Sequence, residues 1–316
     1  MQPFLLPTIL VGLGALLVLA PLVRAKRARR RRKRERRRRR AFWSIGYMES
    51  DSPLRWTPSK AKLLLPKQVA PDLFIIADPF LFEHDGERYL FFEAMREGAA
   101  AAHIECARFD HERQEWALLG CVLSEPFQLS YPQVIRDGEH IYMVPESKQA
   151  HRIGLYRASH FPTEWEFVTP LIEGRKLVDS TLIKHDDHWY CFASRKKRLF
   201  LYIADQLEGP WRPHPANPVR RGNFSRCGGR IIQHDGQHYR LAQDQRGYGA
   251  GLHAFEILTL TPTRYREIPA RTFNPILLPG SAAWTETGMH HLDVIQTAPD
   301  RYFGVFDGEQ FDHPAT

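Results

Sequence analysis

The chain has 316 residues, with 44 Lys and Arg against 36 Asp and Glu, and it carries a formal net charge of +8. The charge is concentrated, because residues 24–40 hold 14 of the basic residues and one Glu, which leaves 30 basic against 35 acidic residues elsewhere. The positive net charge therefore gives no reason to assign a nucleic-acid ligand to the rest of the chain.

The N-terminus begins with a stretch that is typical of a membrane span. Residues 4–23 are twenty uncharged, mostly apolar residues, which is long enough to cross about 30 Å of hydrocarbon. No Lys or Arg precedes them, so the basic start of a cleaved secretory signal is missing. We expect residues 1–23 to form a single transmembrane anchor, with a cleaved leader as the alternative.

The basic segment that follows predicts the orientation of the protein. Under the positive-inside rule, a basic juxtamembrane segment over residues 24–41 places the remainder on the cytoplasmic face of an inner or plasma membrane. We expect residues 24–40 to contact anionic lipid headgroups, at about 1 kcal/mol for each basic side chain near the surface. A tail for nucleic acid or another polyanion, or an import signal, is the alternative. The rest of the chain has no basic stripe with interleaved aromatics, so no specific nucleic-acid partner is expected.

Residues 77–93 read ADPFLFEHDGERYLFFE and predict a β-hairpin that turns at Asp85-Gly86. Four further copies follow with a period of roughly 50 residues, which is typical of a β-propeller with one four-stranded blade per repeat. The sequence therefore predicts an all-β fold, a five-bladed β-propeller over residues 42–316, and a monomer. The equivalent first positions of the five copies are Asp78, Tyr131, Asp179, Gly228 and His291.

The fifth copy ends at Thr316 without the second half that the other copies have. Residues 43–57, WSIGYMESDSPLRWT, are similar to the second half of the second copy, IGLYRASHFPTEWEF. We therefore expect residues 42–66 to complete the last blade, so that the two ends of the domain close the ring and leave no open sheet edge. A plain linker is the alternative.

The candidate site lies where the first strands converge on the central channel. A carboxylate inside an apolar sheet is costly unless it is paired or functional, and two carboxylates across a channel are what glycoside chemistry needs. We expect Asp78 to act as base or nucleophile, and Asp179 or Glu146 to act as acid. Six residues at or near the same positions are expected to bind substrate: Glu93, Tyr131, Arg230, Asp244, His291 and Asp293.

Each of these assignments has a structural alternative. Asp78 precedes a proline, and an Asp in that place commonly caps a turn. Glu93 and Glu146 are equally suited to pairing with Arg residues between blades, and His291 to packing beside His290 in the core. The four cysteines lack metal-ligand spacing, and no phosphate loop, zinc motif or Gly-x-Ser-x-Gly elbow occurs, so no cofactor and no metal is predicted.

The first hairpin resembles the first-blade signature of five-bladed sugar-active propellers, the clan of arabinanases, β-xylosidases and invertases. The resemblance implies that a first-blade Asp is base or nucleophile, a second-blade Asp tunes pKa values, and a third-blade Glu is the acid. Asp78 matches the first position, whereas Tyr131 and Asp179 stand at the second and third. The resemblance therefore implies the fold and the role of Asp78 rather than simple hydrolysis.

A second resemblance covers nearly all of residues 43–310. It rests on ordered motifs that include WSIGYMESDSPL, LSYPQV, YMVPES, FPTEWEF, VDSTLI, YRLAQD and GMHHLD. In these motifs the chain is similar to the N-terminal domain of glucosamine inositolphosphorylceramide transferases. The resemblance implies a sugar-active propeller associated with glycan transfer. The recognised transferase domain of the plant enzyme is a separate C-terminal one, so its activity is not carried over here.

The sequence thus predicts a propeller, tethered at the cytoplasmic face of the membrane, that transfers or cleaves a glycosyl group in the assembly of a glycan or glycolipid. The alternative is a non-catalytic propeller that binds sugar or acts as a scaffold and recruits a separate glycosyltransferase.

Overall fold

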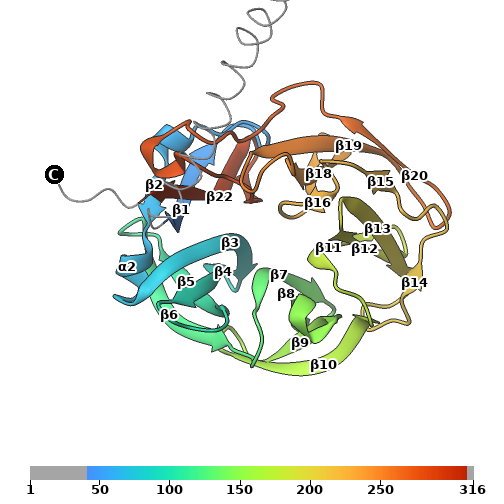
Figure 1. Ribbon diagram of the computed structural model, residues 1–316, viewed down its shortest axis with the longest axis horizontal. Coiled ribbons are helices and arrows are strands. Elements are labelled where there is room, and N and C mark those ends of the chain that lie inside the picture. The colour runs from blue at the N-terminus through green and yellow to red at the C-terminus, as the bar shows by residue number, and fades with distance from the viewer. Residues whose placement is uncertain (1–40, 312–316) are drawn as a thin grey trace, which may run out of the picture. The chain divides into compact units, whose positions relative to one another are not determined.

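Antiparallel hairpins organise the computed structural model, which describes residues 41–311 (Figure 1). The fold is all-β, with strands grouped in sheets that follow one another in chain order around a common centre (Figure 1). One sheet has eight strands. It is built from β1 (Ala41–Ser50), β2 (Lys62–Leu64), β3 (Leu73–His84), β4 (Glu87–Arg96), β5 (His103–Asp110), β6 (Glu115–Leu123), β21 (Leu292–Ala298) and β22 (Arg301–Phe311).

The strand order in that sheet is β21-β22-β1-β3-β4-β5-β6, with β2 paired to the other strands only through β1. The first described strand, in blue, therefore lies in the same sheet as the last one, in red (Figure 1). A single parallel residue pair, Trp43 with Ile75, joins β1 to β3. Backbone pairing between the two halves of this sheet is thus limited to this one residue pair.

The other three sheets are antiparallel and have four, five and five strands. The first contains β7 (Ser130–Asp137), β8 (His140–Ser147), β9 (Arg152–His160) and β10 (Glu164–Glu173). The second contains β11 (Val178–His185), β12 (His188–Arg195), β13 (Arg198–Ala204), β14 (Arg212–Pro213) and β15 (Arg220–Arg221). The third contains β16 (Arg226–Cys227), β17 (Ile232–His234), β18 (Gln237–Gln243), β19 (Leu252–Leu260) and β20 (Tyr265–Pro269).

The helices within residues 41–311 are all short. They are α2 (Pro66–Val69) and the 3-10 turns Pro58–Lys60, Lys148–Ala150 and Ala283–Thr285. None of these helices has the length and apolar character that a membrane crossing requires. The predicted anchor over residues 1–23 and the basic residues 24–40 lie outside the described part of the chain.

The hairpin turns adopt the backbone conformation that their sequences favour. Asp85 and Gly86 both have positive φ, 51° and 77°, and Asp235 and Gly236 repeat this with 50° and 72°. Two-residue hairpin turns that match strand twist need positive φ at both positions, which Asp-Gly tolerates well. The turn chemistry thus sets which face each strand turns toward the centre.

A bulge recurs at the first position of the first three repeats. Asp78, Tyr131 and Asp179 have φ of 50°, 51° and 49°, a left-handed conformation that costs a non-glycine residue about 1–2 kcal/mol. In each hairpin the strand pairing is interrupted at this residue, between Ala77 and Phe80, Ser130 and Gln133, and Val178 and Thr181. A bulge redirects the side chain of the bulged residue. The side chains of these three equivalent residues therefore do not follow the in-and-out alternation of their strands.

Side chains close the centre of the domain. The Tyr131 hydroxyl lies 2.7 Å from Thr181 Oγ1, donates to the Gly229 carbonyl at 3.0 Å and accepts the Gly229 N–H at 2.6 Å. The rings of Phe80, Tyr131 and His291 pack edge to face, with centroids 4.7 to 5.1 Å apart. These five residues come from all five repeats, and we call them the central plug.

Candidate active site

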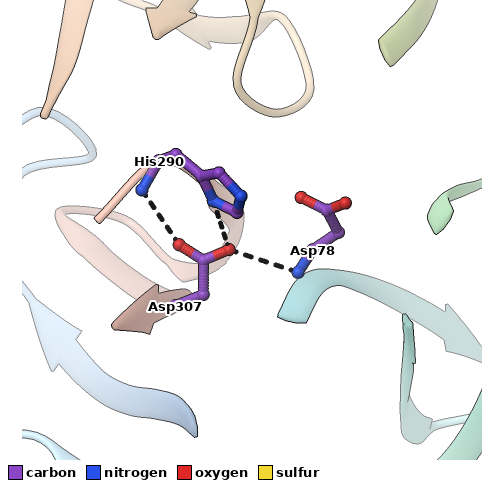
Figure 2. Close-up of side chains that lie close together, drawn as sticks. All are labelled: Asp78, His290 and Asp307. Atoms are coloured by element: carbon purple, nitrogen blue, oxygen red, sulfur yellow. Dashed lines mark hydrogen bonds and ion pairs between the residues drawn. The ribbon is translucent and has the colours of Figure 1, made fainter. Parts of the chain in front are cut away.

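Asp307, at the end of the fifth hairpin, anchors one side of the candidate site (Figure 2). Its Oδ1 accepts the backbone N–H groups of His290 and His291, each at 3.0 Å. Its Oδ2 accepts the backbone N–H of Asp78 at 3.2 Å and lies 2.6 Å from His290 Nδ1. One fully buried carboxylate therefore holds the starts of two neighbouring inner strands in place.

Asp307 and His290 form an ion pair. Burial works to lower the pKa of His290, but the Asp307 carboxylate outweighs it and raises that pKa to about 9. Burial works to raise the pKa of Asp307, and the His290 charge lowers it below its usual value. At neutral pH His290 is thus an imidazolium beside an ionised Asp307. The His290 ring stacks on Trp43 with centroids 4.4 Å apart, and its Nε2 lies 2.8 Å from the Tyr248 hydroxyl.

The Asp78 carboxyl group points away from Asp307, although its backbone N–H is bound there (Figure 2). Burial and the neighbouring charges of Glu93 and Asp179 raise the pKa of Asp78 well above its usual range, and His290 opposes this only in part. Within residues 41–311 no Lys or Arg lies within ion-pair distance of this carboxyl group. Nδ1 of His291 lies 3.6 Å from it, but burial lowers the pKa of His291 to about 4, so that ring is neutral at neutral pH.

Asp179 is neutralised in a different way. Arg226 binds it in a two-pronged ion pair, with Nε on Oδ2 and Nη2 at 3.1 Å from Oδ1. The amide of Gln243 donates a further hydrogen bond of 2.6 Å to Oδ2. Burial works to raise the pKa of Asp179, but Arg226 lowers it below its usual value. Asp179 therefore stays ionised at neutral pH.

Glu146 and Glu93 lie between these two ion pairs. Burial and the Asp179 charge raise the pKa of Glu146 to about 8, although its Oε2 accepts the Asp179 N–H at 3.2 Å and Lys148 lies 3.5 Å from Oε1. Burial and the Glu146 charge raise the pKa of Glu93 to about 7. Both side chains thus exchange protons near neutral pH.

We call Asp78, Glu93, Glu146 and Asp179 the carboxyl cluster, because their pKa values are linked: Glu93 and Asp179 shift Asp78, Glu146 shifts Glu93, and Asp179 shifts Glu146. The cluster holds one permanently ionised carboxylate and three carboxyl groups whose pKa values are raised. Pairs of acidic groups whose environments separate their pKa values are suited to act as proton donor and proton acceptor. The arrangement is therefore chemically competent for acid–base work.

The same region also contains a possible metal-ligand set. Ligand atoms of Asp78, His290 and Asp307 lie within 4.8 Å of one another, and two carboxylates with an imidazole are a plausible donor set for a divalent ion (Figure 2). However, the Asp307 oxygens already accept three backbone N–H groups and contact the His290 imidazolium. A cation would have to displace His290 from Asp307, so the set fits an ion poorly.

The other predicted site residues have structural contacts, although His291 also lies 3.6 Å from Asp78 of the carboxyl cluster. Tyr131 and His291 are fully buried in the central plug, where burial lowers the pKa of His291 to about 4. Arg230 and Asp293 pair with each other at 3.0 Å and bind the inner strands, through the Val134 and Leu81 carbonyls and the Leu81 N–H. These four residues hold inner strands together.

Asp244, which was predicted to bind substrate, has an ion-pair partner within its own loop. It is buried and pairs with Arg246 in the next loop, where Nε of Arg246 lies 2.8 Å from Oδ2. Burial works to raise the pKa of Asp244, but Arg246 lowers it below its usual value. The fourth-copy residue that matches Asp307 in strand register is its neighbour Gln243, whose amide binds Asp179.

Several residues of the site were not predicted as functional from the sequence. Asp307 had a signal, because the strand register puts it at the position that Glu93 and Glu146 hold in the first and second copies. Trp43, Arg226 and Tyr248 lie outside the repeated hairpin, so no alignment of copies could select them. Tyr248 comes from the loop after β18, and its exposed ring also lies 5.9 Å from the Arg226 guanidinium.

With this geometry established, comparison with known proteins identifies relatives. Residues 65–309 match the family model described as glucosamine inositolphosphorylceramide transferase 1, N-terminal. The protein of that name from Oryza sativa subsp. japonica is 34% identical over 247 residues, covering 74% of this chain and 33% of the relative. The one from Arabidopsis thaliana is 30% identical over 299 residues, covering 85% and 39%. The chain thus spans a third or slightly more of these relatives.

Solved structures with a similar fold are sugar-active. A β-1,2-mannobiose phosphorylase from Listeria innocua matches with a TM-score of 0.57 and 14% identity, covering 83% of this chain and 96% of that one. A thermostable family-43 glycoside hydrolase matches with a TM-score of 0.52 and 15% identity, covering 76% and 93%. At such low identity the likeness shows a β-propeller-like fold.

Proposed function

Because this chain belongs to the family of the N-terminal domain of glucosamine inositolphosphorylceramide transferase 1, we propose that it transfers or cleaves a glycosyl group in glycan or glycolipid assembly. The relatives are named as transferases, and the solved structures with the same fold include a phosphorylase and a hydrolase of glycosides. The family thus supports a carbohydrate substrate, and the residues of the site support the chemistry.

The observation that carries the proposal is the distribution of charge in the carboxyl cluster. Asp179 is held by the two-pronged contact with Arg226 and Asp307 by the imidazolium of His290, and both partners are close cations. Within residues 41–311, Glu146 has instead the half-exposed Lys148 at 3.5 Å, and Asp78 has the His291 ring at 3.6 Å and no Lys or Arg. A buried carboxyl group without such a partner costs stability, so a role in binding or catalysis accounts for its presence. Asp78 and Glu146 are therefore the residues to which we assign the reaction.

We assign Glu146 as the proton donor. Its pKa of about 8 keeps it protonated at neutral pH, and it can give that proton to the leaving oxygen of a glycosidic bond as the bond breaks. The sequence left Asp179 and Glu146 as alternatives, and the Arg226 pair makes Asp179 the poorer acid. Asp179 instead raises the pKa of Glu146.

We assign Asp78 as the base or nucleophile. The imidazolium of His290 favours its ionised form, and a proton on Glu93 removes one of the charges that oppose ionisation. Burial and the charges of Asp179 and Asp307 still hold the pKa of Asp78 well above its usual range, so Asp78 must first give up its own proton to act in this role. As a base, Asp78 takes the proton of the acceptor hydroxyl while that oxygen forms the new bond to the sugar. As a nucleophile, its oxygen attacks the sugar carbon directly, and the acceptor then displaces it.

The proposal extends to the architecture. If the single parallel pair between β1 and β3 is a contact between blades, the strands divide into five groups, each beginning with one repeated hairpin. The pairing of β1 with β22 supports a last blade completed by residues 42–66. We further propose a monomer held at the cytoplasmic face of a membrane, with residues 1–23 as anchor and residues 24–40 on anionic lipid.

The second candidate is a non-catalytic propeller that binds sugar or recruits a separate glycosyltransferase. The observation that favours it is that the match covers only 33% and 39% of two plant relatives, so most of each relative lies outside the part that this chain resembles. Under this alternative the carboxyl cluster binds a sugar without turning it over.

The test is a substrate screen of the full-length protein. Nucleotide sugars, amino-sugar donors included, and short glycans are assayed for thermal stabilisation and for product. We expect Asp78→Asn and Glu146→Gln each to lower turnover by about 100-fold or more while the sugar still stabilises the protein. Asp187→Asn and Glu139→Gln, at exposed positions, are the matched controls. Sugar binding without product in the unaltered protein would favour the second candidate, and no response to any sugar would contradict both.

A further inference from the structure

A cavity of about 450 Å³ has none of the carboxyl cluster among its lining residues. Its walls come from the inner strands of the five hairpins, two to five residues beyond the bulged positions and therefore nearer the hairpin turns. The central plug stands between the two regions, since its residues occupy the bulges or lie within two positions of them. The cavity is thus a separate compartment of the same channel, in the size range of small-molecule sites.

The charged side chains that line this cavity are all basic. Arg136, Lys184 and Arg230 line it, and no Asp or Glu of residues 41–311 does. Arg230 is fixed by Asp293, so its charge is already matched. Lys184 lies 3.3 Å from Asp137, with half of its side chain exposed.

Arg136 has no carboxylate partner among the described residues. Its Nη2 instead donates a 2.8 Å hydrogen bond to Nδ1 of His84, which requires that nitrogen to be unprotonated. A guanidinium without a carboxylate partner and a half-exposed ammonium at one wall favour an anion, because a guanidinium fork matches the oxygens of phosphate.

The opposite wall is neutral and polar. Gln233, Gln296 and Tyr302 line the cavity and also an adjoining one of about 400 Å³, which Asp235 and Asp300 help to line. Amides, a phenol and carboxylates bind hydroxyl groups well, and they do not suit a second phosphate. Trp189, at the Lys184 end, offers an indole face for the body of a ligand.

We propose that this cavity binds a phosphorylated sugar or polyol, with the phosphoryl group at Arg136 and Lys184 and the hydroxyl groups at the glutamine wall. The site is distinct from the carboxyl cluster and needs no reaction to occur in it. It accounts for a basic wall and a hydroxyl-binding wall that meet in one cavity at the centre of an otherwise mildly acidic domain.

The experiment is isothermal titration of the full-length protein with glucose 6-phosphate, inorganic phosphate and glucose at low salt. We expect glucose 6-phosphate to bind at least tenfold more tightly than either fragment. The double variant Arg136→Gln/Lys184→Gln should weaken it by about tenfold or more, since two charge-assisted contacts are lost. Both side chains are exposed, so the variant should remain folded.

Two controls make the result decisive. Lys67→Gln/Arg113→Gln removes the same charges from exposed positions outside the cavity and should leave the affinity unchanged. Asp78→Asn should also leave it unchanged, because the central plug separates that carboxyl group from the cavity. The proposal is overturned if glucose 6-phosphate does not bind, if inorganic phosphate binds equally well, if the Arg136/Lys184 variant keeps full affinity, or if Asp78→Asn abolishes binding.

Discussion

The carboxylate of Asp307 accepts the backbone N–H of Asp78, although 229 residues separate the two in the chain. This contact joins the end of the last hairpin to the bulge of the first, at the residue whose carboxyl group we assign to the reaction. The position of Asp78 therefore depends on the two ends of the domain meeting correctly. The same Asp307 holds His290 as an imidazolium, so it sets both the geometry and the charge of the site.

Replacing Asp307 with Asn should strongly destabilise the fold. The change leaves a buried imidazolium without its counter-charge, and breaking a buried pair in this way costs about 3–5 kcal/mol. Urea unfolding of the variant measures the loss, and the pKa of His290, followed by NMR, should fall below the value of about 9. In Asp307→Asn/His290→Gln part of the stability should return. A loss below 1 kcal/mol in the single variant would contradict the ion pair.

Stability should fall as the pH rises from about 4.5 toward 8 because of Glu146. Its pKa is about 8 when folded and 4.5 in the reference state, so between these values the unfolded chain binds fewer protons than the folded one. Each such group lowers the unfolding free energy by up to about 1.4 kcal/mol per pH unit in that range, and the loss ends above the folded pKa.

The measurement compares unfolding free energies of the unaltered protein and Glu146→Gln from pH 4.5 to 9. Glu146→Gln should lack the loss of unfolding free energy that Glu146 causes. The difference in stability between the variant and the unaltered protein should therefore shift in favour of the variant as the pH rises toward 8. His290 acts in the same direction over a higher range, because its raised pKa gives stability that is present below about 6.5 and lost as the pH rises through about 9. The His290 contribution is common to both proteins. Parallel curves of unfolding free energy against pH would therefore show that the pKa of Glu146 is not raised.

Replacing Arg226 with Gln should expose the charge of Asp179. The variant leaves a buried carboxylate with only the Gln243 amide, and we expect about 2–3 kcal/mol of lost stability, less than for a fully buried pair because Arg226 is partly exposed. Arg226→Lys should recover only part of the loss, since an ammonium cannot make the two-pronged contact. Thermal melts against Arg221→Gln, an exposed control, test this, and equal stability of Arg226→Gln and the control would refute it.

Gly229 should tolerate no side chain. Its φ is +143°, and a Cβ there would lie 1.8 Å from the Leu292 carbonyl oxygen, between two inner strands. Gly229→Ala should therefore fail to fold or lose more than about 4 kcal/mol. Gly86→Ala, where φ is also positive but nothing lies within 4 Å, should lose only about 1–2 kcal/mol. Similar melting temperatures for the two variants would contradict the close approach.

The repeated hairpins and the carboxyl cluster were accessible from the sequence because both follow local rules. Asp-Gly turns set the strand register. Aligning the copies placed Asp78 and Asp179 at one equivalent position and Glu93 and Glu146 at another. The packing of Tyr131 and His291 in the central plug could not be predicted from the sequence. Whether a side chain at the first repeat position faces a ligand or fills the plug depends on the size of the rings that pack against it. Arg226 and Trp43 reach the site from outside the repeat, Arg226 by a contact between two sheets and Trp43 from the strand next to β22, and no spacing encodes either contact.

The arrangement of β1 between β22 and β3 also has a consequence during synthesis. β1 is the first described strand to leave the ribosome, while the partner for one of its edges is the last to be made. Until β22 is released, that edge presents unpaired backbone groups to any other nascent strand nearby. Assembly of the carboxyl cluster must wait for the same moment, because Asp307 lies on β22. A ribosome stalled before this strand would hold a domain whose other hairpins are complete but whose Asp78 has not yet been fixed in place.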